Sequence, residues 1–143
     1  MKLITKDIEA ALLRNGRIQQ TLAVQGKADA DFMPVVKLFT PDAGCTWLLT
    51  ELDPDDPDIA FGLCDLGLGC AELGSVRISE IESVRGRLGL PVERDLHFVP
   101  LHTLSVYARA VWQRGAITEC QRALDAAAAD ADDVTVASKV GAP

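Results

Sequence analysis

The sequence predicts an α+β domain, in which an antiparallel β-sheet of about five strands carries short helices packed on one face and C-terminal helices follow. Three observations predict this class. Apolar residues recur every three or four positions near both ends of the chain, as in amphipathic helices. Between them, residues 34–78 contain several β-branched and aromatic runs separated by short turns rich in Pro and Gly. The chain has 143 residues, the length of one ordinary domain.

The first expected element is a short amphipathic helix. Thr5 can act as its N-cap, and apolar residues follow at helical spacing from Ile8 to Leu12. We expect the helix to stop before the Asn-Gly pair that ends at Gly16, because glycine is the usual residue after a helix end. Residues 17–31 are weakly patterned and predict an irregular connection with some helical turn.

The middle of the chain predicts four strands joined by short connections. They cover residues 34–40, 45–51, 59–65 and 71–78. The first two strands form a hairpin, because the Pro41–Gly44 segment between them has the composition of a turn. Residues 52–58 contain two prolines and four aspartates, and we interpret them as a loop.

A short helix and a last strand are expected next. Ser79 and Glu82 have the spacing of a capping box, which predicts a helix of one or two turns that ends near Gly86. Residues 92–99 are interpreted as the last strand. Alternation within a strand would place every second side chain of this segment on the same face.

The C-terminal part predicts two helices. Thr103 can cap the first, which ends at Gly115, and a further helix is expected from Thr118. The apolar face of the first comprises Leu104, Tyr107, Ala108, Val111 and Trp112. We expect a single α+β domain over residues 1–129 and a flexible Ala/Asp-rich tail over 130–143.

Charge is distributed very unevenly along the chain. The formal net charge is -7, and residues 38–76 contain eight acidic and no basic residues. The rest of the chain holds thirteen acidic and fourteen basic residues, so this block carries the whole deficit. A nucleic-acid binder needs clustered Lys and Arg, and direct nucleic-acid binding is therefore not expected. No apolar run is long enough for a membrane span or a signal peptide, which predicts a soluble, cytoplasmic protein.

The acidic block is the first candidate binding surface. Its members are Asp42, Glu51, Asp53, Asp55, Asp56, Asp58, Asp65 and Glu72. Complementary charge would speed encounter with a partner protein that has a basic surface. The alternative is a solvated acidic face that serves solubility alone.

A polar set around the predicted last strand is the second candidate. It comprises Trp47, Glu82, Arg85, Glu93, Arg94, Asp95 and His97. In a strand, Glu93, Asp95 and His97 would share one face and could supply an acid and a base, with an arginine to bind an anion. The alternative is structural, with ion pairs to Arg85 and Arg87 that fix the short helix against the sheet.

Other chemistry has no recognisable signature. The four cysteines form no CxxC pair and are interpreted as small buried hydrophobic residues, so neither disulfides nor a metal site are expected. The acidic loop at residues 53–58 lacks the glycine and the ligand spacing of a calcium-binding loop. No phosphate-binding glycine motif occurs, and no cofactor is predicted. The oligomeric state is left open.

A set of short phrases, in order and with their spacing, resembles a bacterial domain-of-unknown-function family, number 2958. The phrases lie at residues 34–41, 46–51, 61–65, 72–74, 82–86 and 89–96, and the resemblance spans about residues 2–112. It implies a setting rather than a reaction, because such proteins are small products of plasmids, phages and integrative elements. No catalytic residues follow from it.

The expected function is therefore a non-catalytic acidic binding protein carried by mobile genetic elements. Its sharpest form is an anti-defence protein, acting against restriction or CRISPR, that docks on a basic nucleic-acid-handling host protein. The alternative is a small enzyme or small-ligand-binding protein that uses Arg85, Glu93, Arg94, Asp95 and His97.

Overall fold

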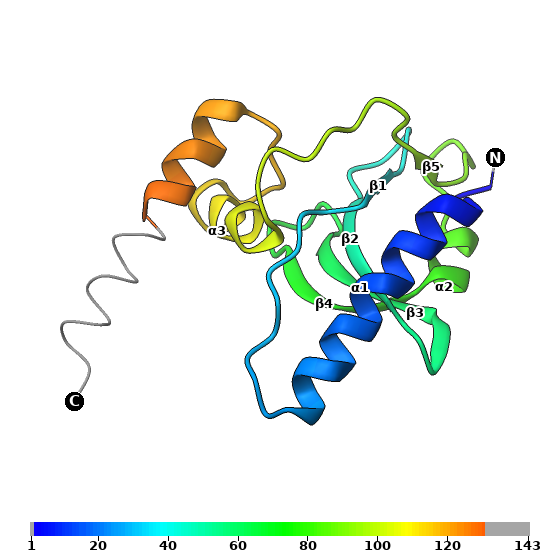
Figure 1. The fold of residues 1–143 in the computed structure, drawn as a ribbon. Helices are drawn as coiled ribbons and strands as arrows, with labels where there is room; N and C mark the ends of the chain where they lie inside the picture. Colours follow the sequence, from blue (N-terminus) through cyan, green and yellow to red (C-terminus); the bar gives the residue numbers. More distant parts are fainter. Residues whose placement is uncertain (1, 131–143) are drawn as a thin grey trace.

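The computed structural model describes residues 2–130 and confirms the α+β class. Five strands form one antiparallel sheet in the order β4-β3-β2-β1-β5 (Figure 1). The strands are β1 (Val36–Phe39), β2 (Thr46–Asp53), β3 (Asp56–Asp65), β4 (Glu72–Arg77) and β5 (Glu93–Arg94). The named helices are α1 (Lys6–Val24), α2 (Ile78–Ser83) and α3 (Leu104–Arg114), and residues 121–130 are also helical. The expected tail over 130–143 lies outside the described residues except for Asp130.

Helix α1 begins as predicted and runs much further than predicted. The Thr5 hydroxyl oxygen accepts a hydrogen bond from the amide of Ile8 at 3.3 Å and caps the helix. The helix continues through Gly16 to Val24, so the expected stop is wrong. Gly16 is buried against β2, where its missing side chain allows the helix to approach the strand closely. A local stop signal is overridden here by a tertiary contact.

The predicted β1–β2 hairpin is confirmed, and strands β2 and β3 are longer than predicted. Strands β1 and β2 pair from Val36 opposite Leu49 to Phe39 opposite Thr46. Strands β2 and β3 pair as far as Asp53 opposite Asp56, with register shifts along the way. Most of the predicted loop over 52–58 therefore belongs to two strands, and only a two-residue turn separates them.

Two expectations between β4 and α3 are wrong. Helix α2 has Arg77 as its N-cap, and the Ser79 hydroxyl bonds to Asp58 of the neighbouring hairpin instead of forming a capping box with Glu82. The predicted strand over 92–99 is reduced to the two residues of β5, because the chain turns directly after it.

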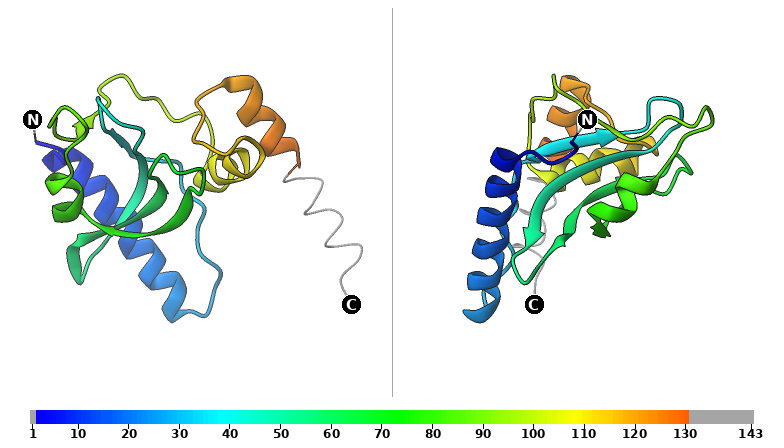
Figure 2. Two further views of the ribbon diagram at one scale, coloured as in Figure 1. Left: turned by 180° about the vertical axis from the view of Figure 1, so that it is seen from behind. Right: turned by 90° about the vertical axis from the view of Figure 1, so that its right-hand side faces the viewer.

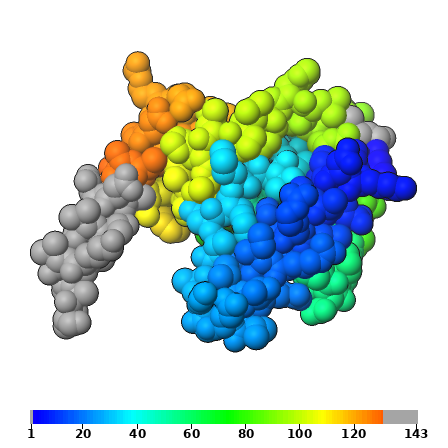
Figure 3. Space-filling model, viewed as in Figure 1, coloured from blue at the N-terminus to red at the C-terminus, as the bar shows by residue number. Residues whose placement is uncertain are grey.

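Helices cover both faces of the sheet. One hydrophobic cluster joins α1 and α2 to the sheet through residues such as Leu12, Trp47 and Ile81. A second cluster joins α3 and the helical segment 121–130 to the opposite face, where Leu48 and Leu63 point. Figure 2 shows α1 and α3 on different sides of the curved sheet. In the space-filling view the β2–β3 turn projects past α1 (Figure 3).

The two tryptophans have different environments. Trp47 is 2% exposed and lies in the first cluster, whereas Trp112 is 72% exposed. The prediction that Trp112 belongs to the buried face of its helix is therefore wrong, although Leu104, Tyr107, Ala108 and Val111 are buried as predicted. Gly115 ends α3 in a left-handed conformation, φ 83°, as expected. No helix within residues 2–130 is long and apolar enough to cross a membrane.

Candidate functional site: an acidic cleft beside the β2–β3 hairpin

The acidic block does not form one continuous face. Strand β3 has ten residues, which places its two ends roughly 30 Å apart. Asp53, Asp55, Asp56 and Asp58 lie at the turn end of the β2–β3 hairpin, with Glu51 nearby on β2. The three remaining members, Asp42, Asp65 and Glu72, lie at the opposite end of the sheet.

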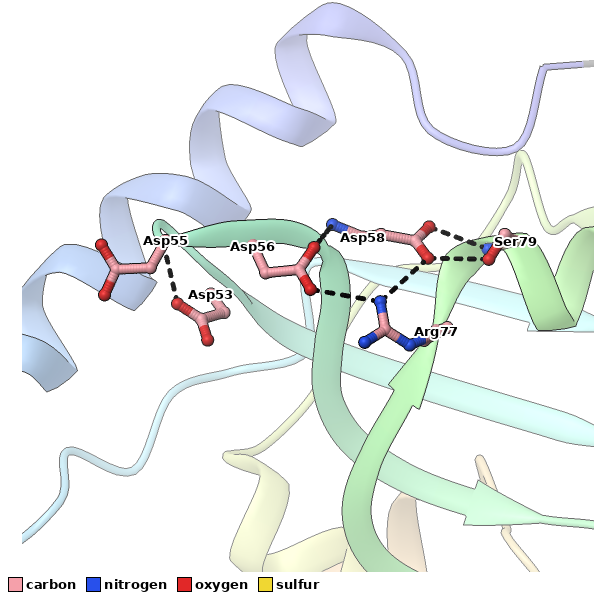
Figure 4. Close-up of polar contacts among 6 residues, drawn as sticks. All are labelled: Asp53, Asp55, Asp56, Asp58, Arg77 and Ser79. Atoms are coloured by element: carbon pink, nitrogen blue, oxygen red, sulfur yellow. Dashed lines mark hydrogen bonds and ion pairs between the residues drawn. The ribbon is translucent and has the colours of Figure 1, made fainter.

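Two of the four aspartates at the hairpin share one neighbouring cation. The Arg77 guanidinium lies 3.2 Å from a carboxylate oxygen of Asp56 and 3.5 Å from one of Asp58. Asp58 also accepts hydrogen bonds from the amide and hydroxyl of Ser79, which, with Arg77, lower the pKa of its carboxyl. Figure 4 shows Arg77 between these two aspartates and away from Asp53 and Asp55.

The acidic residues at the other end of the sheet lie apart from one another, and two of them have structural partners. Asp65 is buried and accepts hydrogen bonds from the amides of Gly67 at 2.8 Å and Ile117 at 3.2 Å. Asp42 accepts bonds from the amides of Leu88 and Leu90 at 2.6 and 3.2 Å. Glu72 is exposed at the start of the edge strand β4. These three residues do not contribute to a common acidic surface with the hairpin.

The carboxylates that have no ion pair with another described residue line a cleft of about 390 Å³. Its acidic members are Asp29, Glu51, Asp53 and Asp55. No Lys, Arg or His is among the residues that line it. Its floor includes Glu51, Phe61 and Ser75, which lie directly opposite one another on three adjacent strands and share one face of the sheet.

Helix α1 and the chain after it form the wall of this acidic cleft. The Gln19 side chain exchanges two hydrogen bonds with the backbone of Ala30, both at 2.9 Å, and donates a third to Glu51 at 3.2 Å. Gln20 donates to Asp55 at 3.0 Å. The Asn15 amide donates to the carbonyl oxygen of Thr50 at 2.9 Å. Neutral amides thus fix the carboxylates without balancing their charge.

The pKa of Glu51 reflects the electrostatic environment of the cleft. Burial raises the pKa of its carboxyl above the ordinary value, and the nearby charge of Asp29 raises it further, against hydrogen bonds that lower it. The arrangement therefore disfavours the ionised form of Glu51 in the isolated protein. A cation in the cleft would reverse this effect, because an opposite charge at close range stabilises a carboxylate.

The polar set of the second candidate site is dispersed. Trp47 is in the core, and His97 is exposed. Arg94 donates hydrogen bonds to the carbonyl oxygens of Lys2 and Leu3 at 2.5 and 2.9 Å, and so fixes the N-terminal segment. Asp95 accepts a hydrogen bond from the amide of His97 and pairs with Lys37 at 3.2 Å, and these contacts lower the pKa of its carboxyl.

The other three members of this set share a second cleft. Glu82, Arg85 and Glu93 line a hollow of about 530 Å³ together with Lys2, Leu3, Pro91 and Val92. Arg85 donates to the carbonyl oxygens of Glu82 and Val84, both at 2.9 Å. Since β5 ends at Arg94, the shared strand face expected for Glu93, Asp95 and His97 does not form.

Sequence reasoning missed three residues of the acidic cleft. Gln19 and Gln20 lie beyond the point where α1 was expected to stop, and Asp29 lies in a segment whose charge is nearly balanced. The signal that could have found the glutamines is a helix that continues past Gly16. Nothing local to Asp29 indicates that it faces the hairpin.

Within residues 2–130, no group of three or more His, Cys, Asp or Glu residues could hold a metal ion. Neither a search of curated proteins nor a search of solved structures gives a match. A family model described as "Protein of unknown function (DUF2958)" matches residues 3–118, which include every element from α1 to α3 and all residues of the acidic cleft. The chain therefore belongs to this family.

Proposed function

We propose that this protein is a non-catalytic binding protein whose acidic cleft receives basic side chains of a partner protein. The observation that carries the proposal is the cleft itself, in which Asp29, Glu51, Asp53 and Asp55 meet without any basic residue. Its volume of about 390 Å³ is at the lower end of small-molecule sites and suits one or two long side chains.

Arginine fits this chemistry best. Its planar guanidinium can donate paired hydrogen bonds to carboxylates, and such charge-assisted bonds are stronger than neutral ones. The walls of the cleft also contain apolar atoms of Leu52, Ile59 and Phe61, against which the methylene stem of an arginine can pack. The cleft therefore has carboxylates for the guanidinium of an arginine and apolar atoms for its methylene stem.

The electrostatics of the cleft also support binding. Burial and the charge of Asp29 disfavour the ionised form of Glu51. Arg77 forms its ion pairs with Asp56 and Asp58, which lie outside the cleft. A half-buried carboxylate beside a second acidic residue departs from the usual rules of stability, and such departures are typical of functional sites. A basic partner would restore the balance of charge.

The biological setting comes from the resemblance described above. We propose that the protein is carried by mobile genetic elements and that its partner is a basic nucleic-acid-handling host protein in the cytoplasm. An anti-defence role against restriction or CRISPR is the specific form of this proposal. The acidic cleft would then compete for the basic side chains that such a host protein uses on phosphates.

The alternative, a small enzyme or ligand-binding protein at Arg85, Glu93, Arg94, Asp95 and His97, has less support. The side chains do not converge, since Arg94 fixes the N-terminal segment and Asp95 pairs with Lys37. Only Glu93 and Arg85 of this set share a cleft.

An affinity purification from the native host, with matched variants as bait, tests the proposed function. The cleft variant is Asp53→Asn/Asp55→Asn, and the control is Asp56→Asn/Asp58→Asn. Both change the net charge equally and lie on the same hairpin, but only the second pair forms ion pairs with Arg77. We expect a basic partner that is captured by the wild type and the control and lost with the cleft variant.

Two results would contradict the proposal. Equal loss with both variants would show that only the total charge matters, and equal retention would show that the cleft is not the contact. Enzymatic turnover of a metabolite that depends on Glu93 would instead support the alternative.

A further inference from the structure

We propose that the partner protein supplies its basic side chain from an extended segment, which pairs antiparallel with the free edge of β4 and adds a sixth strand to the sheet. This inference rests on the proposed function and names the structure of the partner segment. Two observations carry it. The outer edge of β4 is unpaired, and Ser75 of this same strand lines the acidic cleft.

Strand β4 is an edge strand whose outer side has no neighbour. In the sheet it lies next to β3 alone (Figure 1). Within the described part of the chain, the backbone of residues 72–76 makes no hydrogen bond apart from those with β3. Every second residue of an edge strand directs its N–H and C=O outward, so about three residues of β4 present both groups to solvent. None of the six residues of β4 is buried.

This edge lacks the features that usually block strand addition. The pairing of β4 with β3 has no register shift, so no bulge twists the edge away. The strand contains neither Pro nor Lys, and its charged residues, Glu72 and Arg77, stand at its two ends. The opposite edge, β5, has only two residues and is shorter than an ordinary strand. An open edge of six residues is the kind of surface to which extended peptides add.

The acidic cleft extends to this edge. Glu51, Phe61 and Ser75 pair across β2, β3 and β4, and all three line the cleft. A residue of an added strand directly opposite Ser75 continues this row on the same face of the sheet. Neighbouring strands lie about 4.8 Å apart, so that residue stands roughly 14 Å from Glu51 along the row. Only a long side chain can extend over Ser75 and Phe61 toward the carboxylates.

The residues of β4 on this face define the segment further. Arginine suits the position opposite Ser75, because the cleft has four carboxylates and no basic residue. Leu73 and Arg77 flank Ser75 on the same face. Leu73 is 43% exposed and favours an apolar residue opposite it, whereas Arg77 disfavours a basic one. In an antiparallel pair, the residue opposite Leu73 comes two positions after the arginine. The segment is therefore an extended strand with an arginine followed two residues later by an apolar residue.

Amide hydrogen exchange measured by NMR tests this inference, with a capped seven-residue peptide as the probe. The peptide has arginine at its centre, leucine two positions later and threonine elsewhere, because threonine favours a strand. At a free peptide concentration ten times the dissociation constant, the outward amides of β4 should exchange about tenfold more slowly. A peptide that causes no protection of β4 overturns the inference.

Two N-methylated versions of the peptide test for backbone pairing. One carries methyl groups on the nitrogens of its second, fourth and sixth residues, and the other on those of its third, fifth and seventh residues. Only one of these two sets can face β4. We expect one version to bind at least about tenfold more weakly than the other, since it loses two or more backbone hydrogen bonds. Equal binding of the two versions overturns the inference.

The cleft variant Asp53→Asn/Asp55→Asn separates this inference from the proposed function. Weaker binding of the peptide to this variant, without protection of β4 in the wild type, overturns the edge pairing and leaves the proposed function standing. Protection of β4 that is unchanged in the variant supports the edge pairing and contradicts the proposed function. Protection that appears without peptide and rises with protein concentration would identify a second copy of the chain as the occupant and overturn the inference.

Discussion

Gly16 of α1 lies directly against the backbone of Leu52 in β2. A Cβ atom added to Gly16 would stand 1.9 Å from the carbonyl oxygen of Leu52, far inside any permitted contact. This approach brings the second half of α1 alongside the β2–β3 hairpin and places Gln19 next to Glu51. The glycine that was expected to end the helix is thus the residue that lets the acidic cleft form.

Gly16→Ala is therefore expected to destabilise the protein by about 1–3 kcal/mol, the usual cost of overpacking. In an exposed helix the same substitution would stabilise by about 1 kcal/mol. Gly74→Ala is the matched control, since a Cβ there meets no atom within 4 Å. Urea denaturation of both variants measures the difference, and a Gly16→Ala protein as stable as the wild type would refute the packing argument.

Arg94→Ala is expected to destabilise the protein by about 1.5–3 kcal/mol, because the guanidinium donates charged hydrogen bonds to the carbonyl oxygens of Lys2 and Leu3. Leu3 and Ile4 are buried, so amide hydrogen exchange should quicken there first. Arg14→Ala, on the exposed side of α1, serves as the control and should change stability by less than about 0.5 kcal/mol. Unchanged exchange at Leu3 would contradict the anchoring role.

Glu51→Gln is expected to stabilise the isolated protein at pH 7. The folded-state pKa of Glu51 is raised above its ordinary value of 4.5, so the folded protein holds this proton more tightly than the unfolded chain. Stability contributed by the protonated form is lost as pH rises from about 4.5 through the folded pKa. The gain from Glu51→Gln should therefore vanish below about pH 4. Denaturation curves at both pH values check the sign, and a loss of stability at pH 7 would contradict it.

Asp58→Ala and Ser79→Ala are each expected to destabilise the protein, and the double variant should be little worse than either. The reason is that Asp58 accepts both the amide and the hydroxyl of Ser79 near the start of α2. These bonds lower the pKa of Asp58, so their stabilisation is present above its ordinary value of 3.8 and is lost as pH falls through the folded pKa.

Urea denaturation at pH 7 and pH 3 measures both effects. Ser83→Ala is the control, since its hydroxyl bonds only to the carbonyl oxygen of Glu80 within the same helix. Additive losses from Asp58→Ala and Ser79→Ala would show that the two residues act independently.

Local patterns were sufficient for much of the fold. The Thr5 cap, the β1–β2 hairpin and the end of α3 at Gly115 were all predictable, because each depends on residues adjacent in the sequence. The failures have the opposite origin. Gly16 continues a helix because of a contact with Leu52, and Ser79 bonds to a residue twenty-one positions away. Tertiary contacts of this kind cannot be predicted from the residues adjacent in the sequence.

The candidate site was predictable only in part. The acidic composition of the hairpin could be seen in the sequence. Which of its carboxylates pair with a cation and which line the cleft could not be predicted. Arg77 forms ion pairs with Asp56 and Asp58 because β4 returns beside β3. Asp29 lies near Glu51 because the chain after α1 passes the hairpin. Asp42 and Asp65 belonged to the same acidic run and are instead loop anchors.

The central claim is that the acidic cleft binds basic side chains, and an amide NMR titration with a short arginine-rich peptide tests it most directly. We predict chemical-shift changes concentrated at Gln19, Ala30 and residues 51–55. The dissociation constant should rise at least about fivefold in Asp53→Asn/Asp55→Asn and change little in Asp56→Asn/Asp58→Asn. Shifts centred on Asp42 or Glu72, or equal weakening in the two variants, would contradict the claim.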